Sequence, residues 1–322
     1  MKNTGSPRGC SRREFLAAAG VTGAGLLTWA PVAAHAESEQ SRHNKPCLGL
    51  TLGAGGANGL AHIPVLEVLD EMGIRPGIIS GSSIGAIMGV LYASGIPGQD
   101  MRKASLELFD SAPGILGGWL ERITGSGLLE MLRPGLGDGG LLDPGGVLEY
   151  VQDKIKVKHF EELQIPVKVV AADFWKREQV VFDSGEIIPA IQASMAVPGL
   201  FAPVQYSDRL LVDGAIVNPV PFDLVLDHCD ISIAVDVSGK SSPGKEERPS
   251  YLDTIFATFE IMQEAIMQQK LKVNSTDIYL RPDIVDVRLM QFNKIRKILD
   301  QAGESRERLA KELEKLVSVQ RF

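Results

Sequence analysis

The chain has 322 residues, 44% of them hydrophobic and 23% charged, a composition typical of a globular protein with a sizeable core. Its formal net charge at pH 7 is −7. Because nucleic-acid binding needs a surplus of Lys and Arg to neutralise phosphates, this charge argues against nucleic acid as the main partner. His and Cys do not recur at the spacing of a metal site, so the sequence predicts neither a metal nor a cofactor.

The first 36 residues indicate an export signal. Arg12-Arg13 precede an uncharged run from Phe15 to Ala34, which ends in the small-x-small cleavage pattern Ala34-His-Ala36. Paired arginines followed by Phe and Leu are typical of a twin-arginine signal. We therefore expect residues 37–322 to form a single domain that works in the periplasm or outside the cell. The alternative is that the run stays uncleaved and anchors the protein, since ~20 residues can span a bilayer.

The next segments alternate between strand and helix patterns. An apolar strand at 48–52 leads through the glycine loop Gly53–Gly59 into a helix with apolar residues at a spacing of three. A short apolar run at 78–79 leads into a second helix that begins near Ile84. Alternation of this kind predicts an α/β fold with a mostly parallel central sheet and helices on both faces.

Residues 111–142 are rich in glycine and apolar side chains. This composition fits a lid over a binding site, or two short amphipathic helices that cover the sheet. Asp143-Pro144 then predicts the start of a helix. The remaining expected elements are a hairpin at 167–173 and 179–182, strands at 210–212, 231–236 and 277–280, and helices at 251–272 and 291–318.

Cys47 and Cys229 remain if the signal is removed, and each precedes a predicted strand. An oxidising compartment permits a disulfide between them. The alternative is two unpaired small side chains in the core.

Gly81-Ser-Ser-Ile-Gly85 fits the pattern G-x-S-x-G between a strand and a helix. In this motif a sharp turn holds the central serine, here Ser83, in a strained backbone, so that its hydroxyl stands at the edge of the sheet. Gly81 and Gly85 allow neighbouring chain to pass close by. The helix that follows points its positive end at the site and favours a developing anion.

A nucleophilic serine needs a base. One candidate is a histidine triad with His159 or His228, but Ser83 lies on only the second strand, earlier than in an α/β-hydrolase. The other is Asp213, which ends an apolar strand and precedes Gly214. A carboxylate has a reference pKa near ~3.9, and partial burial raises it towards the range of a useful base. An Asp-Gly turn between two strands is the structural alternative.

The glycine loop, G-x-S-x-G and Asp213-Gly-Ala together resemble the patatin-like phospholipase family. Gly59-Leu-Ala-His-Ile63, Ala190–Pro203 and Val212–Pro221 also look like this family's pattern, and the resemblance runs from about residue 48 to 237.

The resemblance implies a Ser-Asp dyad without histidine, formed by Ser83 and Asp213. It implies hydrolysis of fatty-acyl esters of lipids at a membrane surface, without a metal or cofactor. The backbone N–H groups of Gly55 and Gly56 would hold the oxyanion, an interaction typically worth about 10²–10³ in rate.

The glycine loop departs from the family's usual Gly-Gly-Gly-x-Arg-Gly at two positions. Ala54 replaces the first glycine and Asn58 replaces the arginine, so Asn58 keeps donor capacity without charge. Two other functions compete with hydrolysis: a catalytically weak or inactive lipid-binding relative, and a nucleotide-binding module. For the latter, the G-x-G-x-x-G spacing from Gly53 fails at Asn58.

Overall fold

A mixed sheet forms the centre of the computed structural model, which describes residues 46–110, 133–134, 140–240 and 251–320. Within these residues the sheet has eight strands in the order β10-β9-β1-β2-β5-β8-β7, and β6 also pairs with β5. Strands β10, β9, β1, β2 and β5 run parallel, as predicted. The strands of this sheet are β1 Leu48–Leu52, β2 Ile78–Ser82, β5 Val167–Asp173, β6 Glu178–Phe182, β7 Val204–Tyr206, β8 Arg209–Asp213, β9 Ile231–Val235 and β10 Ile278–Leu280.

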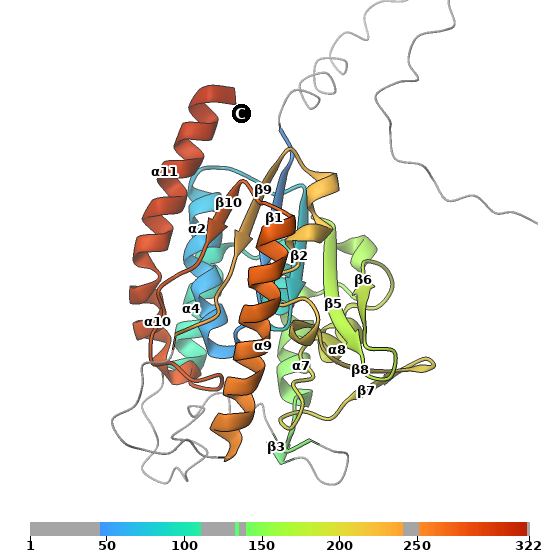
Figure 1. Cartoon of the computed structure of the whole chain (residues 1–322). Coiled ribbons are helices and arrows are strands. Elements are labelled where there is room, and N and C mark those ends of the chain that lie inside the picture. Colours follow the sequence, from blue (N-terminus) through green and yellow to red (C-terminus); the bar gives the residue numbers. More distant parts are fainter. Residues whose placement is uncertain (1–45, 111–132, 135–139, 241–250, 321–322) are drawn as a thin grey trace, which may run out of the picture. The chain divides into compact units, whose positions relative to one another are not determined.

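The helices lie around this sheet, and a separate two-stranded pair is formed by β3 Arg133–Pro134 and β4 Leu142–Asp143 (Figure 1). The α-helices are α2 His62–Glu71, α3 Ile84–Ala93, α4 Gly98–Phe109, α7 Gly145–Ile155, α8 Ile187–Ser194, α9 Tyr251–Val273, α10 Ile295–Gln301 and α11 Gly303–Gln320. Short 3-10 turns are η2 Gly56–Ala61, η3 Phe160–Glu162, η4 Gly214–Ile216, η5 Phe222–Leu224, η6 Leu226–His228 and η7 Phe292–Lys294.

Both faces of the sheet are covered, which explains why β1, β2 and β9 are buried along their whole length. In β9, Ile231 and Ile233 belong to the main hydrophobic core, whereas Ala234 belongs to a second cluster with Met267 of α9. Successive side chains of a strand point to opposite faces, so α9 packs on the face opposite the main core. Figure 1 shows α9 crossing in front of the sheet. The predicted fold class is confirmed.

Strand β5 places the ends of two other strands next to each other. One edge of β5 pairs with β6 along Val169–Asp173. The opposite edge pairs first with β2, where Ser82 lies opposite Val170, and then with β8, where Asp213 lies opposite Ala171. Because β2 runs parallel and β8 antiparallel to β5, their carboxyl ends meet head to head at this edge.

Some elements differ from the expectation. The single helix expected at 291–318 is two helices, α10 and α11, separated at Ala302, whose buried side chain belongs to the core. The amphipathic helix α4 and the short strand β7 were not predicted. The expected hairpin is confirmed as β5 and β6. A helix follows Asp143-Pro144 as expected, but Pro144 is its N-cap and Gly145 its first residue, whose N–H donates to Asp143 Oδ1 at 2.9 Å.

Cys47 and Cys229 are free thiols in the structure. Each is half-buried beside the amino end of a strand, Cys47 before β1 and Cys229 before β9. Their sulfur atoms fill the space above two glycines: a side chain at Gly77 would meet Cys47 Sγ, and one at Gly49 would meet Cys229 Sγ. The unpaired alternative is therefore the one that the structure contains.

Two predictions fall outside the described residues. The first is the export signal expected at residues 1–36. The second is the lid expected at 111–142, of which the structure describes only residues 133–134 and 140–142. Among the described helices, none is both long and apolar enough to cross a bilayer.

Gly85 lets the start of helix α3 lie directly against the end of strand β1. A Cβ at Gly85 would lie 2.0 Å from the carbonyl oxygen of Leu52, an atom that cannot move aside. We expect Gly85→Ala to lower the free energy of unfolding by at least about 2 kcal/mol, measured by urea denaturation. Gly303→Ala is the matched control, because a Cβ there meets nothing within 4 Å, and it should change stability by less than about 0.5 kcal/mol. Equal losses in the two variants would contradict this packing.

Candidate active site

Ser83 occupies a sharp turn between β2 and α3. Its backbone has φ 54° and ψ −125°, a left-handed conformation that is strained for a residue with a side chain. The side chain is buried, with 7% of the residue exposed. The strained turn expected from G-x-S-x-G is therefore present.

Asp213 lies directly beside Ser83. The Oγ of Ser83 donates a hydrogen bond of 2.6 Å to Oδ2 of Asp213, across 130 positions of sequence. The other carboxylate oxygen accepts the N–H of Ala215 at 2.8 Å, so the first residues of η4 fix its orientation. Only 3% of Asp213 is exposed.

Burial raises the pKa of Asp213 to about 6, while the hydrogen bonds from Ser83 and from the N–H of Ala215 lower it. A carboxylate with such a pKa is largely ionised at neutral pH and is a stronger base than an exposed one. The site therefore combines a hydroxyl, a desolvated base and a bond that joins them.

The histidine alternative does not fit the geometry of the described residues. His228 is exposed and contacts Nζ of Lys168 at 2.9 Å, whereas His159 contacts Glu162. Neither histidine contacts Ser83 or Asp213. Of the candidate bases, only Asp213 contacts the serine.

The glycine loop lies over the same site. The N–H groups of Gly53, Ala54 and Ala57 donate to the carbonyls of Val235, Pro219 and Leu289. The N–H groups of Gly55 and Gly56 have no acceptor in the part of the chain that the structure describes. Both residues line a small cavity together with Ser83 and Asp213, so two backbone donors are available there.

His62 holds the start of this loop. Its Nε2 lies 2.8 Å from the carbonyl oxygen of Gly53, so Nε2 carries the proton and donates. The ring is fully buried, and burial lowers its pKa to about 4 against the opposing effect of the bond to Gly53. A neutral His62 thus anchors the loop without adding charge to the site.

The glycines of the motifs lie where the chain is too crowded for a side chain. A Cβ at Gly214 would lie 2.2 Å from the carbonyl oxygen of Val170, and one at Gly81 would meet the backbone of Gly85. A Cβ at Gly59 would collide with Ile84, the residue after Ser83. These glycines let the loop, the turn and the strand β8 approach one another.

Asn58, which stands where the resemblance leads one to expect arginine, is buried with 6% exposed. Its Oδ1 has no partner among the described residues, and its amide packs against Gly239. Asn58 lines the small cavity with Ser83 and Asp213. An uncharged amide, rather than a cation, therefore faces this side of the site.

Ser194 is a positioning residue that the sequence did not reveal. Its Oγ accepts the N–H of Ser83 at 2.9 Å and donates to the carbonyl of Val170 at 2.6 Å. It thereby ties the end of α8 to the strained turn and to β5. Its place within Ala190–Pro203, a stretch that looks like the family's pattern, is a sequence signal that could have indicated it.

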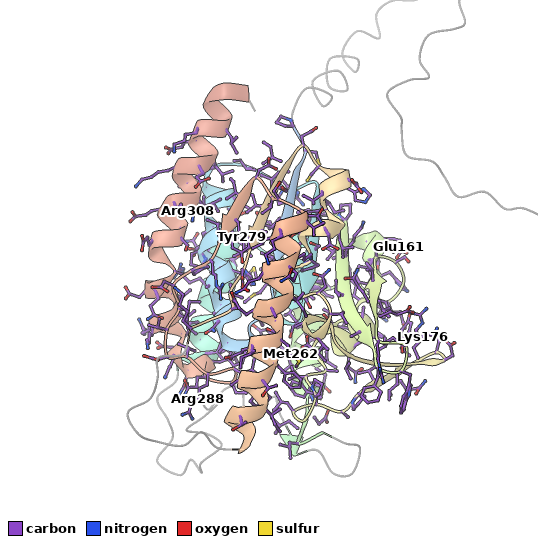
Figure 2. The ribbon with its side chains drawn as sticks, in the orientation of Figure 1. Glu161, Lys176, Met262, Tyr279, Arg288 and Arg308 are labelled. Carbon is purple, nitrogen blue, oxygen red and sulfur yellow. The ribbon has the colours of Figure 1, made fainter. Side chains whose placement is uncertain are left out.

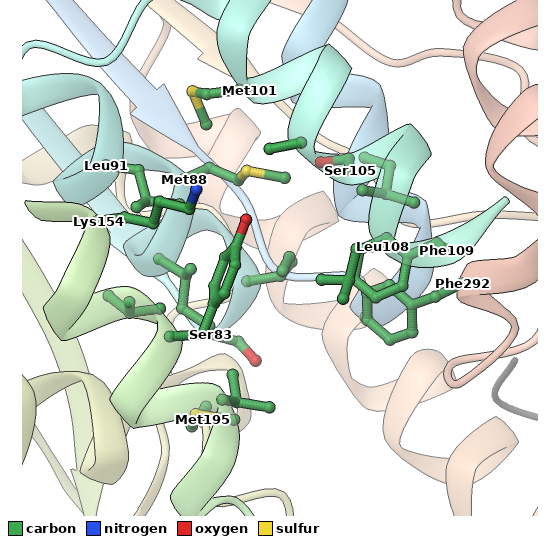
Figure 3. Close-up of a pocket in the computed structure, with 18 of the residues that line it drawn as sticks. Ser83, Met88, Leu91, Met101, Ser105, Leu108, Phe109, Lys154, Met195 and Phe292 are labelled. Atoms are coloured by element: carbon green, nitrogen blue, oxygen red, sulfur yellow. The ribbon is translucent and has the colours of Figure 1, made fainter. Parts of the chain in front are cut away.

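A large apolar cavity begins at Ser83. It has a volume of about 580 Å³ and lies between α3, α4 and α7 (Figure 3). Its lining includes Ile87, Met88, Leu91, Met101, Leu108, Phe109, Met195 and Phe292. Ser83 lies at the boundary between this apolar space and the small cavity with the unpaired N–H groups.

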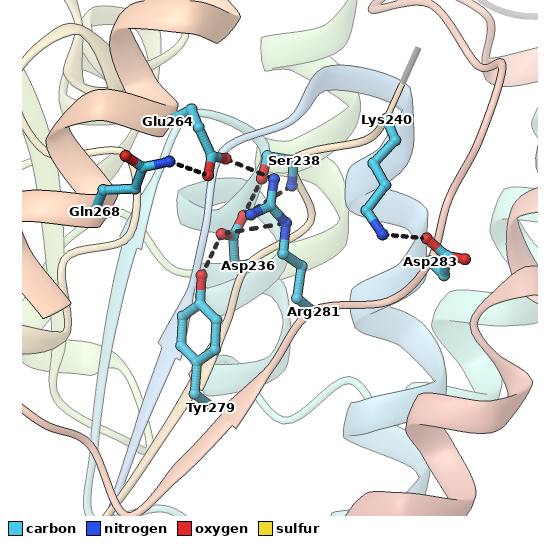
Figure 4. A network of polar contacts seen from close by, with 8 residues as sticks. All are labelled: Asp236, Ser238, Lys240, Glu264, Gln268, Tyr279, Arg281 and Asp283. Carbon is cyan, nitrogen blue, oxygen red and sulfur yellow. Dashed lines mark hydrogen bonds and ion pairs between the residues drawn. The ribbon is translucent and has the colours of Figure 1, made fainter. Parts of the chain in front are cut away.

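A polar network holds α9 against the carboxyl ends of β9 and β10 (Figure 4). Tyr279 donates to Asp236, and Ser238 donates to the other oxygen of that carboxylate. Arg281 bonds Glu264 of α9 at 2.7 Å. Burial and the nearby Asp236 raise the pKa of Tyr279, so its hydroxyl stays protonated as a donor. The network fixes Ser238, a wall residue of the small cavity.

Comparison with known proteins identifies the family. A model of the patatin-like phospholipase family matches residues 50–226, more than half of the chain. The chain belongs to the patatin-like phospholipase family. The resemblance stated from the sequence is thus confirmed, and the protein is a member of a family of lipid hydrolases.

Related patatin-like proteins occur in bacteria and mammals. An uncharacterised NTE-family protein of Mycobacterium tuberculosis is 34% identical over 209 residues, covering 64% of this chain and 54% of that protein. Rat patatin-like phospholipase domain-containing protein 7 is 25% identical, covering 79% of this chain and 20% of that protein. The match thus spans about half of the mycobacterial relative and a smaller part of the rat one.

Two solved structures are similar in outline. VipD from Legionella pneumophila has a TM-score of 0.42 and 15% identity, covering 82% of this chain and 67% of that one. ExoU from Pseudomonas aeruginosa, solved in complex with SpcU, has a TM-score of 0.45 and 16% identity, covering 84% of this chain and 53% of that one.

The buried carboxylate of Asp213 should lower stability at neutral pH. Its pKa is about 6 in the folded protein against a reference of 3.8, so the unfolded chain loses this proton first as pH rises. The free energy of unfolding therefore falls between about pH 4 and pH 6, and the full cost, on the order of 3 kcal/mol, is present above that range.

Asp213→Asn removes this titration. Relative to the unmodified protein, the variant should therefore gain on the order of 3 kcal/mol of stability between about pH 4 and pH 8, measured by urea denaturation at both pH values. Asp208→Asn is the control, because Asp208 is exposed at the turn between β7 and β8. A stability difference for Asp213→Asn that does not change with pH would contradict the burial of this charge.

Proposed function

We propose that this protein is a serine lipid acyl hydrolase that cleaves fatty-acyl esters through Ser83 and Asp213. One observation carries the proposal: the buried bond of 2.6 Å between Ser83 Oγ and Asp213 Oδ2, at the edge of a large apolar cavity. Membership of a lipid hydrolase family gives the reaction class, and the cavity gives the apolar part of the substrate a place to bind.

In the first step Ser83 Oγ attacks the ester carbonyl while its proton passes to Asp213 Oδ2. The carbonyl oxygen becomes negatively charged, and the N–H groups of Gly55 and Gly56 offer two donors to it. When the intermediate collapses, the bond to the alcohol breaks and the alcohol leaves with the proton from Asp213. The acyl group remains on Ser83.

In the second step water replaces the alcohol. Asp213 takes a proton from this water, whose oxygen attacks the acyl carbonyl, and the same N–H groups receive the second oxyanion. The bond to Ser83 Oγ then breaks, the proton returns to the serine, and the fatty acid is released. A single carboxylate thus serves as base and as acid in turn.

The apolar cavity fits the acyl chain. Helix α3 starts just after Ser83 and runs along it, with Ile87, Met88 and Leu91 in the wall. At 1.5 Å per residue, Leu91 lies about 12 Å along the helix from the nucleophile, a length that suits a fatty-acyl chain rather than a short acid. Each methylene buried there contributes about 0.8 kcal/mol of binding.

The small cavity on the other side of Ser83, about 60 Å³, has room for the atoms of the alcohol part that lie next to the ester bond. Asn58 and Ser238 line it, with Phe256 and Phe259 of α9. Asn58 offers a neutral amide to a hydroxyl or ester oxygen of the alcohol, and no charge to a phosphate. A Ser-Asp hydrolase with this lining therefore suits neutral or zwitterionic lipids.

Removal of either reactive side chain should abolish hydrolysis without unfolding the protein. We expect Ser83→Ala and Asp213→Asn each to lower kcat/KM for a p-nitrophenyl fatty-acyl ester by at least about 10⁴-fold, because nucleophile and base act as a unit. Ser105→Ala is the matched control, since this hydroxyl lines the same cavity and should matter little. Circular dichroism checks folding. Full turnover by either dyad variant would refute the proposal, and vesicle binding without turnover by the unmodified protein would favour an inactive lipid-binding relative.

Filling the far part of the apolar cavity should shorten the preferred acyl chain. Leu91→Trp places a larger side chain in the wall away from Ser83, and exclusion of two methylenes would lower kcat/KM for long-chain esters by about 15-fold. Short-chain esters should lose less than about twofold. Leu91→Met keeps the volume and is the control. If both chain lengths lose equally in Leu91→Trp, the acyl chain does not lie along α3.

A further inference from the structure

The turn between β5 and β6 carries an exposed pair of aromatic rings. Trp175 is 74% exposed and Phe174 is 46% exposed. The two rings stack edge to face, with centroids 4.8 Å apart. Large aromatic side chains seldom remain so open to water without a partner, so this pair requires an explanation.

The exposure is built into the hairpin. Asp173 is buried, and its Oδ1 accepts the N–H groups of Trp175 at 3.1 Å and of Lys176 at 2.9 Å. The carbonyl of Asp173 accepts the N–H of Arg177, and Phe174 donates to the carbonyl of Leu210 in the neighbouring strand. These bonds hold the turn in one shape and hold its rings outward.

Two cations flank the rings. Lys176 and Arg177 are exposed and form no ion pair with any residue of the described ranges. The nearby acids Asp173 and Glu178 instead face Arg209, at 4.0 Å and 3.9 Å. The tip Phe174–Arg177 therefore presents two rings and two positive charges that form no ion pair with a described residue, on a chain whose formal charge is −7.

The tip lies at the same end of the sheet as Ser83. In the parallel pair of β2 and β5, Ser82 lies opposite Val170, and β5 continues to Asp173. At ~3.3 Å per residue the tip begins about 13 Å beyond the level of Ser82 in the same direction. Figure 2 shows Lys176 at the periphery of the molecule, on the side away from α11.

We propose that the tip Phe174–Arg177 docks the protein onto an anionic phospholipid bilayer. Tryptophan rings favour the boundary between headgroups and acyl chains, and Lys and Arg favour the phosphates above it. Two rings on a narrow turn are too small for a stable protein interface, which buries about 800 Å² on each partner. Docking here would bring the sheet edge that carries Ser83 towards the lipid surface. Hydrolysis itself does not require such docking, so the tip adds a membrane-binding site to the proposed function.

The test measures binding and needs no turnover. In a Trp29→Phe, Trp119→Phe background Trp175 is the sole tryptophan, so its fluorescence reports the tip directly. Vesicles of phosphatidylcholine with phosphatidylglycerol should shift its emission to shorter wavelength. Vesicles of phosphatidylcholine alone should bind more weakly.

In the unmodified background, Trp175→Ala should weaken co-sedimentation with the anionic vesicles by about 10-fold. The pair Lys176→Gln, Arg177→Gln should weaken it by about 30-fold, about fivefold for each charge.

Arg308→Gln with Lys311→Gln is the matched control. Both side chains are exposed on α11, and the charge change is identical. Figure 2 shows Arg308 on the opposite side of the view from Lys176. This control pair should bind vesicles like the unmodified protein. Hydrolysis of a soluble short-chain ester should also be unchanged in all tip variants, whereas hydrolysis of vesicle lipid should fall in parallel with binding.

Unchanged Trp175 emission with anionic vesicles, or equal binding by the tip and control variants, would overturn the proposal. Trp175-dependent self-association in sedimentation velocity, without vesicle binding, would overturn it too and assign the tip to a second copy of the chain. Loss of soluble-ester turnover in Ser83→Ala tests the hydrolase separately, so the two proposals fail independently.

Discussion

The site depends on the meeting of two strand ends beside a third strand. Strand β2 pairs with one edge of β5 as far as Ser82. Strand β8 pairs with the next part of the same edge in the opposite direction and ends at Asp213. This arrangement is possible only because the sheet is mixed at that point, and it brings together residues 130 positions apart. If β8 ran parallel to β5 along the same residues, its carboxyl end would lie near Asp173 rather than near Ala171, farther from Ser82.

The two groups that meet there are held in costly states. Ser83 has a left-handed backbone, and Asp213 is a carboxylate almost without water. The sheet and two hydrogen bonds hold them in these states. The N–H of Ser83 donates to Ser194 Oγ, and the N–H of Ala215 donates to the carboxylate of Asp213. Such strained and desolvated groups are typical of functional sites, where stability is lost in exchange for reactivity.

The sequence predicted those parts of the structure that local patterns determine. The parallel strands, the strained turn at Ser83 and the glycines at close contacts follow from apolar runs and from G-x-S-x-G. Asp213 was a candidate because it ended a strand and because Asp213-Gly-Ala is part of the family resemblance. Its contact with Ser83 depends on strand order, which no local pattern encodes. The bridging role of Ser194 and the burial of Asn58 depend on tertiary contacts in the same way. The break between α10 and α11 was missed because apolar periodicity continues across Ala302.

The most direct test of the Ser83–Asp213 dyad is the pH dependence of covalent labelling by a fluorophosphonate, followed by mass spectrometry of the labelled peptide. The account predicts a single labelled serine, Ser83, and a labelling rate that rises with pH to a plateau with a midpoint near pH 6, the pKa of Asp213. In Asp213→Asn that rise should disappear and the rate should stay low. Labelling at another residue, or a rate at Ser83 that is the same with and without the carboxylate of Asp213, would contradict it.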